Sequence, residues 1–147
     1  MLSEILDTEE NSKKTPAPTV QTLSILVIED SESDVYLVQS MLEEVSPDIT
    51  FNIKDVPRLV DAFKIVKREK FDIILLDLNL LDIQGVASVA ALHAEIPNTP
   101  IIVYSGMDDP KLRRESLLCG AQYYLVKGKQ TSGSLKYVIE NVLSNHA

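Results

Sequence analysis

Apolar residues along this chain alternate between two kinds of spacing. Five short apolar runs lack a helical period and are rich in strand-favouring residues, as in strands that are buried on both faces. They lie at 24–28, 49–53, 71–76, 101–104 and 123–126. Between these runs, apolar residues recur every three or four positions, as on the buried face of an amphipathic helix. The pattern therefore predicts strands that alternate with helices.

Start and stop residues bound the expected helices. Ser31 or Ser33 would cap the first helix, and Pro47 would stop it. Pro57 opens the second helix, and the fourth runs from Pro110 to a C-cap glycine at 120. The last helix begins near residue 132 or 134. The expected apolar faces are Val35, Val38, Met41, Leu42 and Val45; Val56, Leu59, Val60, Phe63 and Val66; Val86, Val89, Ala90, His93 and Ile96; and Leu135, Val138, Ile139, Val142 and Leu143.

This order of elements predicts an α/β fold, a doubly wound five-stranded parallel sheet with helices on both faces. The 147 residues are enough for one domain with a sizeable core. We expect that domain at 23–147, preceded by an extension over 1–22 whose prolines and polar residues favour an extended linker. An alternative for the extension is a docking segment for a second subunit.

Composition excludes some classes of function. The net charge of -8 argues against a nucleic-acid-binding surface, which needs clustered Lys and Arg. Cys119 is the only cysteine, so no internal disulfide forms, and no Cys/His cluster has metal-ligand spacing. No apolar stretch is long enough to cross a bilayer, and the first ten residues are acidic, unlike a secretory signal. We expect a soluble, cytoplasmic protein.

Polar residues follow four of the expected strands, and parallel strands bring their carboxyl ends to one edge of a sheet. They are Glu29 and Asp30, Asp77, Ser105 and Gly106, and Lys127. Each of the charged residues alone also fits a structural role, as a cap or a solvated side chain. Carboxylates gathered at one edge repel one another, so they have raised pKa values or bind a cation. Oxygen ligands with room for water suit Mg²⁺.

Four segments in the same order resemble the response-regulator receiver domain, over residues 23–146. They are the acidic pair at 29–30, Leu75-Leu-Asp-Leu-Asn-Leu80 with Gly85 beyond it, Tyr104-Ser-Gly106, and Gly120-Ala-Gln-Tyr-Tyr-Leu-Val-Lys127. The resemblance implies a flavodoxin-like sheet with strand order 2-1-3-4-5. It also implies a stand-alone response regulator of two-component signalling, which acts through phosphorylation-dependent protein contacts rather than as an enzyme.

The resemblance implies a role for each acid. Asp77 would be the phosphoacceptor, taking a phosphoryl group from a histidine of a sensor kinase or phosphotransfer protein. Asp30, Asp77 and the backbone carbonyl of Asn79 would hold Mg²⁺, with Glu29 contributing through water. Phosphoryl transfer depends mainly on positioning and charge neutralisation, which agrees with this assignment.

The remaining polar residues would serve the phosphoryl group. Lys127 and Ser105 would contact its oxygens, and Gly106 would leave room for the donor. Tyr124 would be the aromatic switch residue, filling the space that Ser105 vacates when it moves inward. This motion would repack the surface formed by the fourth helix, the fifth strand and the fifth helix, as a shift between two populations.

Two positions depart from the family. Gly128 follows Lys127 where the family usually has a proline, often in a cis peptide, and Leu81 replaces another proline. A cis bond to a non-proline residue is costly, so we expect a trans bond or a reshaped loop after Lys127. Ser105 in place of threonine keeps the hydroxyl group.

Three functions remain open from the sequence. The first is a single-domain response regulator without a DNA-binding or catalytic output domain, whose output is a downstream protein, a phosphotransfer histidine or a homodimer. The second is a receiver-like adaptor that works without phosphate. The third, a phosphatase with an aspartyl-phosphate intermediate, would want an acid where Asn79 stands. We expect His93 to lie on a helix face and His146 in the tail, neither as a metal ligand, and Cys119 to be a small packed residue.

Overall fold

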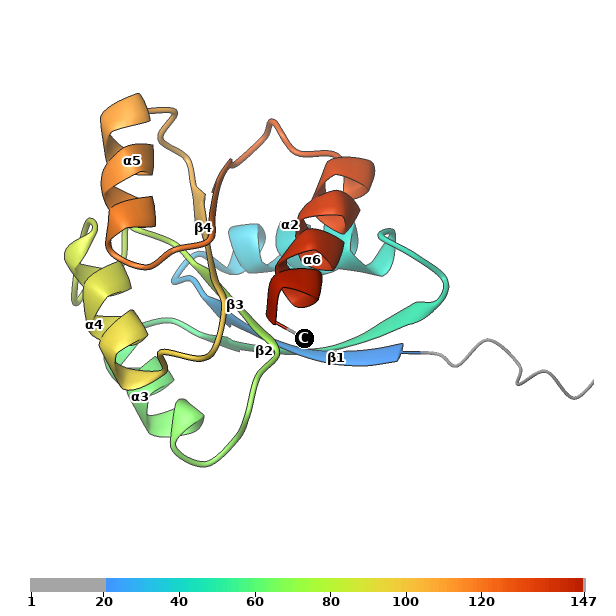
Figure 1. Ribbon diagram of the computed structural model, residues 1–147, viewed down its shortest axis with the longest axis horizontal. Helices are drawn as coiled ribbons and strands as arrows, with labels where there is room; N and C mark the ends of the chain where they lie inside the picture. The colour runs from blue at the N-terminus through green and yellow to red at the C-terminus, as the bar shows by residue number, and fades with distance from the viewer. Residues whose placement is uncertain (1–20, 147) are drawn as a thin grey trace, which may run out of the picture.

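The computed structural model describes residues 21–146, which form a five-stranded parallel sheet between two layers of helices (Figure 1). The strand order is β2-β1-β3-β4-β5, which confirms the predicted fold class. The strands are β1 (Gln21–Ile28), β2 (Ile49–Val56), β3 (Ile73–Leu76), β4 (Ile101–Ser105) and β5 (Tyr123–Val126). The helices are α2 (Glu32–Glu43), α3 (Leu59–Val66), α4 (Ala87–Glu95), α5 (Pro110–Leu118) and α6 (Ser132–His146).

The sheet separates two apolar cores. On one face, α2 and α6 pack on side chains such as Ile25, Ile73 and Ile102. On the other face, α3, α4 and α5 pack on alternate residues of the same strands, among them Leu26 and Ile74. Because successive side chains of a strand point to opposite faces, a strand buried on both sides must be apolar throughout. The four residues of β3 are accordingly all buried.

Several element boundaries differ from the sequence prediction. The first strand begins at Gln21, so the sheet includes two residues that we had assigned to the extension, and the predicted extension otherwise lies outside the described residues. The second strand continues to Val56, which pairs with Ile28. Placing Val56 on a helix face was therefore wrong. Helix α3 begins only at Leu59, where the carboxylate of Asp82 accepts hydrogen bonds from the N–H groups of Leu59 and Val60 at 3.1 and 3.0 Å.

Three predicted helix faces are also partly wrong. Ala90 is exposed, whereas Leu92 of the same helix is buried. Val60 is 41% exposed, and Val45, although buried, lies beyond the end of α2. The predicted apolar faces of α2 and α6 otherwise pack on the sheet. The N-cap of α2 is Ser31, the first of the two serines expected there, and its hydroxyl accepts from Asp34 N–H.

Gly120 allows α4 and α5 to approach closely. Its φ is +120°, and a Cβ built on it would lie 2.5 Å from Cγ of His93. No other residue type fits this combination of backbone conformation and contact. His93 is therefore a packing residue of α4, as expected. Among the described residues, no helix is both long and apolar enough to cross a membrane.

Candidate functional site

The carboxyl ends of β1, β3, β4 and β5 surround a cavity of about 410 Å³. The sequence prediction placed seven residues at this edge with direct roles in metal or phosphate binding, and all seven line the cavity. They are Glu29, Asp30, Asp77, Asn79, Ser105, Gly106 and Lys127. Their convergence follows from the parallel sheet, in which every strand delivers its last residue to the same edge.

Asp77 is held firmly at the floor of the cavity. It follows the last residue of β3, and its N–H donates to the carbonyl oxygen of Ile28 at 3.0 Å, which extends the ladder between β1 and β3. Its Oδ1 accepts from the backbone N–H of Asn79 at 3.2 Å. Only 6% of Asp77 is exposed. The second carboxylate oxygen, Oδ2, faces the ammonium group of Lys127.

Three carboxylates form a candidate cation site. Glu29, Asp30 and Asp77 each offer one oxygen, and these three oxygens lie within 4.8 Å of one another. Oxygen ligands on one side and an open, polar cavity on the other suit Mg²⁺, which retains several waters. The residues present therefore fit the predicted metal. Asn79 lines the same cavity.

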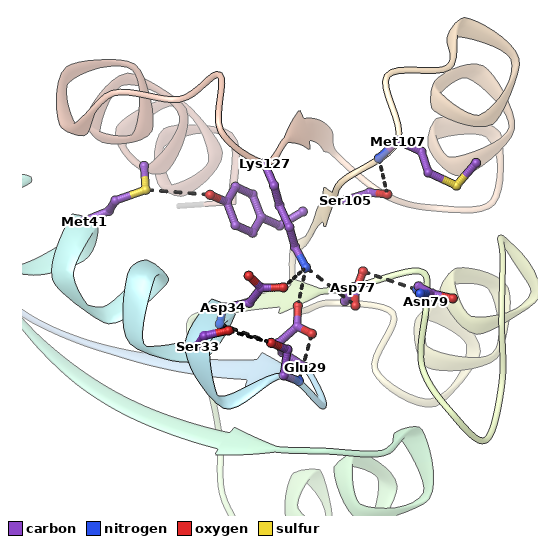
Figure 2. A network of polar contacts seen from close by, with 11 residues as sticks. Glu29, Ser33, Asp34, Met41, Asp77, Asn79, Ser105, Met107 and Lys127 are labelled. Carbon is purple, nitrogen blue, oxygen red and sulfur yellow. Dashed lines mark hydrogen bonds and ion pairs between the residues drawn. The ribbon is translucent and has the colours of Figure 1, made fainter.

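Lys127 contacts two of these acids, Glu29 and Asp77, and a further acid, Asp34 (Figure 2). Its Nζ lies 2.6 Å from Oε2 of Glu29, 3.0 Å from Oδ2 of Asp34 and 3.7 Å from Oδ2 of Asp77. The ammonium also lies 6.0 Å from the centroid of the Tyr104 ring. The single cation thus sits among three carboxylates, and its strongest contacts are not with Asp77.

Burial and the neighbouring charges shift the pKa values of Glu29 and Lys127. Burial raises the pKa of Glu29 to about 7, and the charge of Asp77 adds to this rise against the lowering effect of Lys127. Burial alone would lower the pKa of Lys127, but its hydrogen bonds to Glu29 and Asp34 and the charge of Asp77 outweigh burial and raise it. Lys127 therefore keeps its charge, whereas Glu29 takes up a proton near neutral pH.

The opposite side of the cavity connects to Tyr124. The hydroxyl oxygen of Ser105 accepts from the backbone N–H of Met107 at 3.2 Å, and the hydroxyl of Tyr124 donates to the carbonyl oxygen of Met107 at 2.6 Å. Tyr124 is only 3% exposed, and the guanidinium of Arg113 lies 5.3 Å from the centroid of its ring. Its predicted switch role therefore has a physical link to the site in the loop after β4.

The glycines of the site act in different ways. A Cβ on Gly106 would meet no heavy atom within 4 Å, so packing does not require glycine there and the open space belongs to the cavity mouth. Gly128 has a φ of +83°, and the N–H of Lys129 donates to the carbonyl oxygen of Val126 at 3.2 Å. This is the arrangement of a type II turn, which needs a positive φ at its third position. All described peptide bonds are trans, as expected after Lys127.

Among the described residues that line the cavity, Asp34 is the one charged residue that the sequence analysis missed. It lies in the first turn of α2 and lines the cavity. Asp34 is four positions after Asp30, but Asp30 precedes the N-cap and is not helical, so this spacing alone did not place the two residues on one helix face. The capping bond from Asp34 N–H to the hydroxyl of Ser31, 3.4 Å long, fixes where that first turn points. Among the described residues, Cys119 lies at the end of α5, away from the cavity lining, and the side chain of His146 lies outside the described part.

Comparison with known proteins identifies the same segment. Residues 25–138 match the family model described as the response regulator receiver domain. A curated relative, the cell cycle transcriptional regulator CtrA of Caulobacter vibrioides, is 29% identical over 105 residues, which cover 71% of this chain and 44% of that protein. The chain therefore spans less than half the length of this relative.

Solved structures share the fold. A CheY-like response regulator receiver domain protein from Methanospirillum hungatei JF-1 superposes with a TM-score of 0.73 at 20% identity, over 86% of this chain and 97% of that one. The receiver domain of a sensor histidine kinase from Pseudomonas aeruginosa PAO1 gives a TM-score of 0.70 at 21% identity, over 84% and 98% of the two chains. That structure contains a magnesium ion coordinated in its active site cleft.

Proposed function

We propose, from the premise that this chain belongs to the response regulator receiver domain family, that Asp77 accepts a phosphoryl group from a histidine of a sensor kinase or phosphotransfer protein. Receiver domains are signalling modules rather than classical enzymes. The observation that carries the proposal is the position of Asp77. Its carboxylate is buried, faces an open cavity, and lies beside two acids, Glu29 and Asp30, and the ammonium of Lys127. Phosphorylation then changes which proteins the chain binds.

The transfer needs a nucleophile and charge neutralisation. An oxygen of the Asp77 carboxylate attacks the phosphorus, the bond from phosphorus to the donor nitrogen breaks, and that nitrogen keeps the electron pair. The bond from Asn79 N–H to Oδ1 orients the carboxylate for this attack. Lys127 lies close enough to pair with the phosphoryl oxygens once they are attached to Asp77.

Mg²⁺ completes the proposed site. Asp30 and Asp77 would hold it directly, Glu29 would contribute through water, and the backbone carbonyl of Asn79 would be the remaining protein ligand. The ion supplies positive charge that offsets the negative oxygens of the phosphoryl group. The mutual distances among the three acids support this assignment.

Ser105 and Tyr124 would report the state of Asp77 to the surface. The hydroxyl of Ser105 would donate to a phosphoryl oxygen, and Gly106 beside it leaves the entry open for the donor. Movement of Ser105 would change the loop at Met107, to which Tyr124 is bonded. Moving such an equilibrium from about one per cent to ninety-nine needs ~5.5 kcal/mol, which a few charge-assisted hydrogen bonds of ~1.5 to 3 kcal/mol each can supply.

Acetyl phosphate with Mg²⁺, followed by intact mass measurement, tests this function. The wild-type protein should gain the mass of one phosphoryl group, and Asp77→Asn should gain none. Asp108→Asn is the matched control, because Asp108 is an exposed acid near the same edge that pairs with Lys129. It should be phosphorylated like the wild type. No gain in the wild type would favour the phosphate-independent adaptor, for which Gly128 and Leu81 are the sequence argument.

Other expectations stay predictions. These are a cytoplasmic location, the absence of nucleic-acid binding, and a downstream protein or a homodimer as the output. A comparison of the proteins that bind with and without beryllofluoride would test the phosphate-dependent part of this set.

A further inference from the structure

Of the three carboxylates around the ammonium of Lys127, those of Asp34 and Asp77 lie on opposite sides of it, and Glu29 makes the shortest contact, at 2.6 Å. Figure 2 shows Asp34 on one side of Nζ and Asp77 on the other. The contact with Asp34 is a hydrogen bond of 3.0 Å, whereas the distance to Asp77 is 3.7 Å. Lys127 therefore leans away from the candidate phosphoacceptor in this structure.

Asp34 differs from the other acids around this lysine. Glu29 and Asp77 belong to the group of three whose oxygens lie within 4.8 Å of one another, and Asp34 does not. A cation bound by that group would neutralise Glu29 and Asp77 but would leave the charge of Asp34 unchanged. The backbone of Asp34 is also fixed without Lys127, since Asp34 lies in the first turn of α2 and its N–H donates to the hydroxyl of the N-cap Ser31.

We propose that Asp34 is a positioning residue that holds Lys127 off the phosphoacceptor and releases it when a phosphoryl group arrives. The proposal rests on the proposed function and adds a regulatory element to the same site. In the resting state Asp34 holds the ammonium group of Lys127. Once Asp77 carries a phosphoryl group, Asp34 competes with the phosphoryl oxygens for that ammonium group. Its charge therefore weakens the bound state, and its removal should strengthen it.

Binding of beryllofluoride in the presence of Mg²⁺ measures this competition at equilibrium. Asp34→Asn keeps the shape of the side chain and removes its charge, and we expect beryllofluoride to bind at least threefold more tightly. Asp34→Glu restores a carboxylate and should bring the affinity back toward the wild-type value. Unchanged or weaker binding by Asp34→Asn would overturn the proposal.

Glu32→Gln is the matched control for a general effect of charge. Glu32 is an exposed acid in the same first turn of α2, and it is not among the described ion-pair partners of Lys127. We expect this variant to bind beryllofluoride like the wild type. A gain equal to that of Asp34→Asn would show that only the net charge of the turn matters, and the proposal would fall.

A second measurement needs no variant of Asp34. In protein labelled with ¹⁵N-lysine, the Nζ resonance of Lys127, assigned with Lys127→Arg, should shift when beryllofluoride binds, because the ammonium leaves Asp34. Saturation without such a shift would contradict the proposal while the proposed function stands. A wild-type protein that does not bind beryllofluoride contradicts the proposed function, and this inference fails with it.

Discussion

Tyr124 and Ser105 are joined through the backbone of Met107. The tyrosine hydroxyl donates to the carbonyl oxygen of Met107, and the N–H of Met107 donates to the hydroxyl oxygen of Ser105. One residue of the loop after β4 therefore contacts both the candidate phosphate site and a side chain buried beneath α5. The side chains of Ser105 and Tyr124 are therefore both bonded to the backbone of the same residue.

The first prediction concerns the bond between Tyr124 and Met107. Tyr124→Phe keeps the ring and removes the donor, so the unfolding free energy should fall by about 1 kcal/mol. Amide hydrogen exchange at 105–109 should become faster, because the loop loses its anchor. Tyr104→Phe is the matched control, since it loses only a 3.7 Å contact between its hydroxyl and the sulfur of Met41. Equal exchange in wild type and Tyr124→Phe would show that this bond does not hold the loop.

The second prediction concerns two neighbouring carboxylates. The charge of Asp77 is one cause of the raised pKa of Glu29, although burial is the larger one. Asp77→Asn should therefore lower the pKa of Glu29 from about 7, but not as far as its ordinary value of 4.5. Carbon-detected NMR of the glutamate carboxyl groups measures this directly. Asp108→Asn should leave the pKa of Glu29 in place, and a value unaffected by Asp77→Asn would mean that burial alone sets it.

The third prediction concerns Mg²⁺ and pH. Below pH 7 the carboxyl group of Glu29 is mostly protonated, and a proton on it opposes metal binding. Mg²⁺ affinity should therefore fall as the pH falls through 7, by at most about tenfold per pH unit for one proton, and should become level above that range.

Folding stability should change with pH in the opposite direction to Mg²⁺ affinity. The pKa of Glu29 is higher in the folded protein than its ordinary value of 4.5, so the folded state binds the extra proton. The stability that comes from this extra proton on Glu29 is fully present below pH 4.5 and is lost as the pH rises through about 7. Glu29→Gln should flatten both profiles. Metal affinity that still falls below pH 7 in Glu29→Gln would assign the proton to another group.

The sequence predicted the parts of the site that depend on the sheet. Strand ends are marked by a change from apolar to polar residues, and a parallel sheet brings those ends together, so Asp77 and Lys127 could be placed without coordinates. Asp34 could not be placed in this way, because the direction of its side chain depends on how the first turn of α2 is oriented relative to Glu29 and Asp30. Two local hydrogen bonds fix this orientation, from Ser31 N–H to the carboxylate of Glu29 and from Asp34 N–H to the hydroxyl of Ser31.

The errors in the predicted strand boundary and helix face have a similar origin. Val56 precedes a proline and resembles the start of a helix, but strand β1 offers it a partner at Ile28, and pairing extends β2 to that point. Ala90 has a small side chain that fits either a buried or an exposed position. Only the packing of α4 on the sheet, with Leu92 inward, decides its exposure.

The last prediction concerns the residue after Lys127. Because Gly128 has a φ of +83°, a residue with a Cβ is strained there, and Gly128→Ala should destabilise the protein by ~1 to 2 kcal/mol. Gly128→Pro, which introduces the residue usual in the family, should be worse in this loop, since proline fixes φ near −65°. Gly133→Ala is the matched control, because its Cβ would make only an ordinary contact at 3.8 Å inside α6. Chemical unfolding should show Gly133→Ala as stable as the wild type or more so. A Gly128→Pro protein at least as stable as the wild type would mean that this turn readily adopts the family's usual geometry.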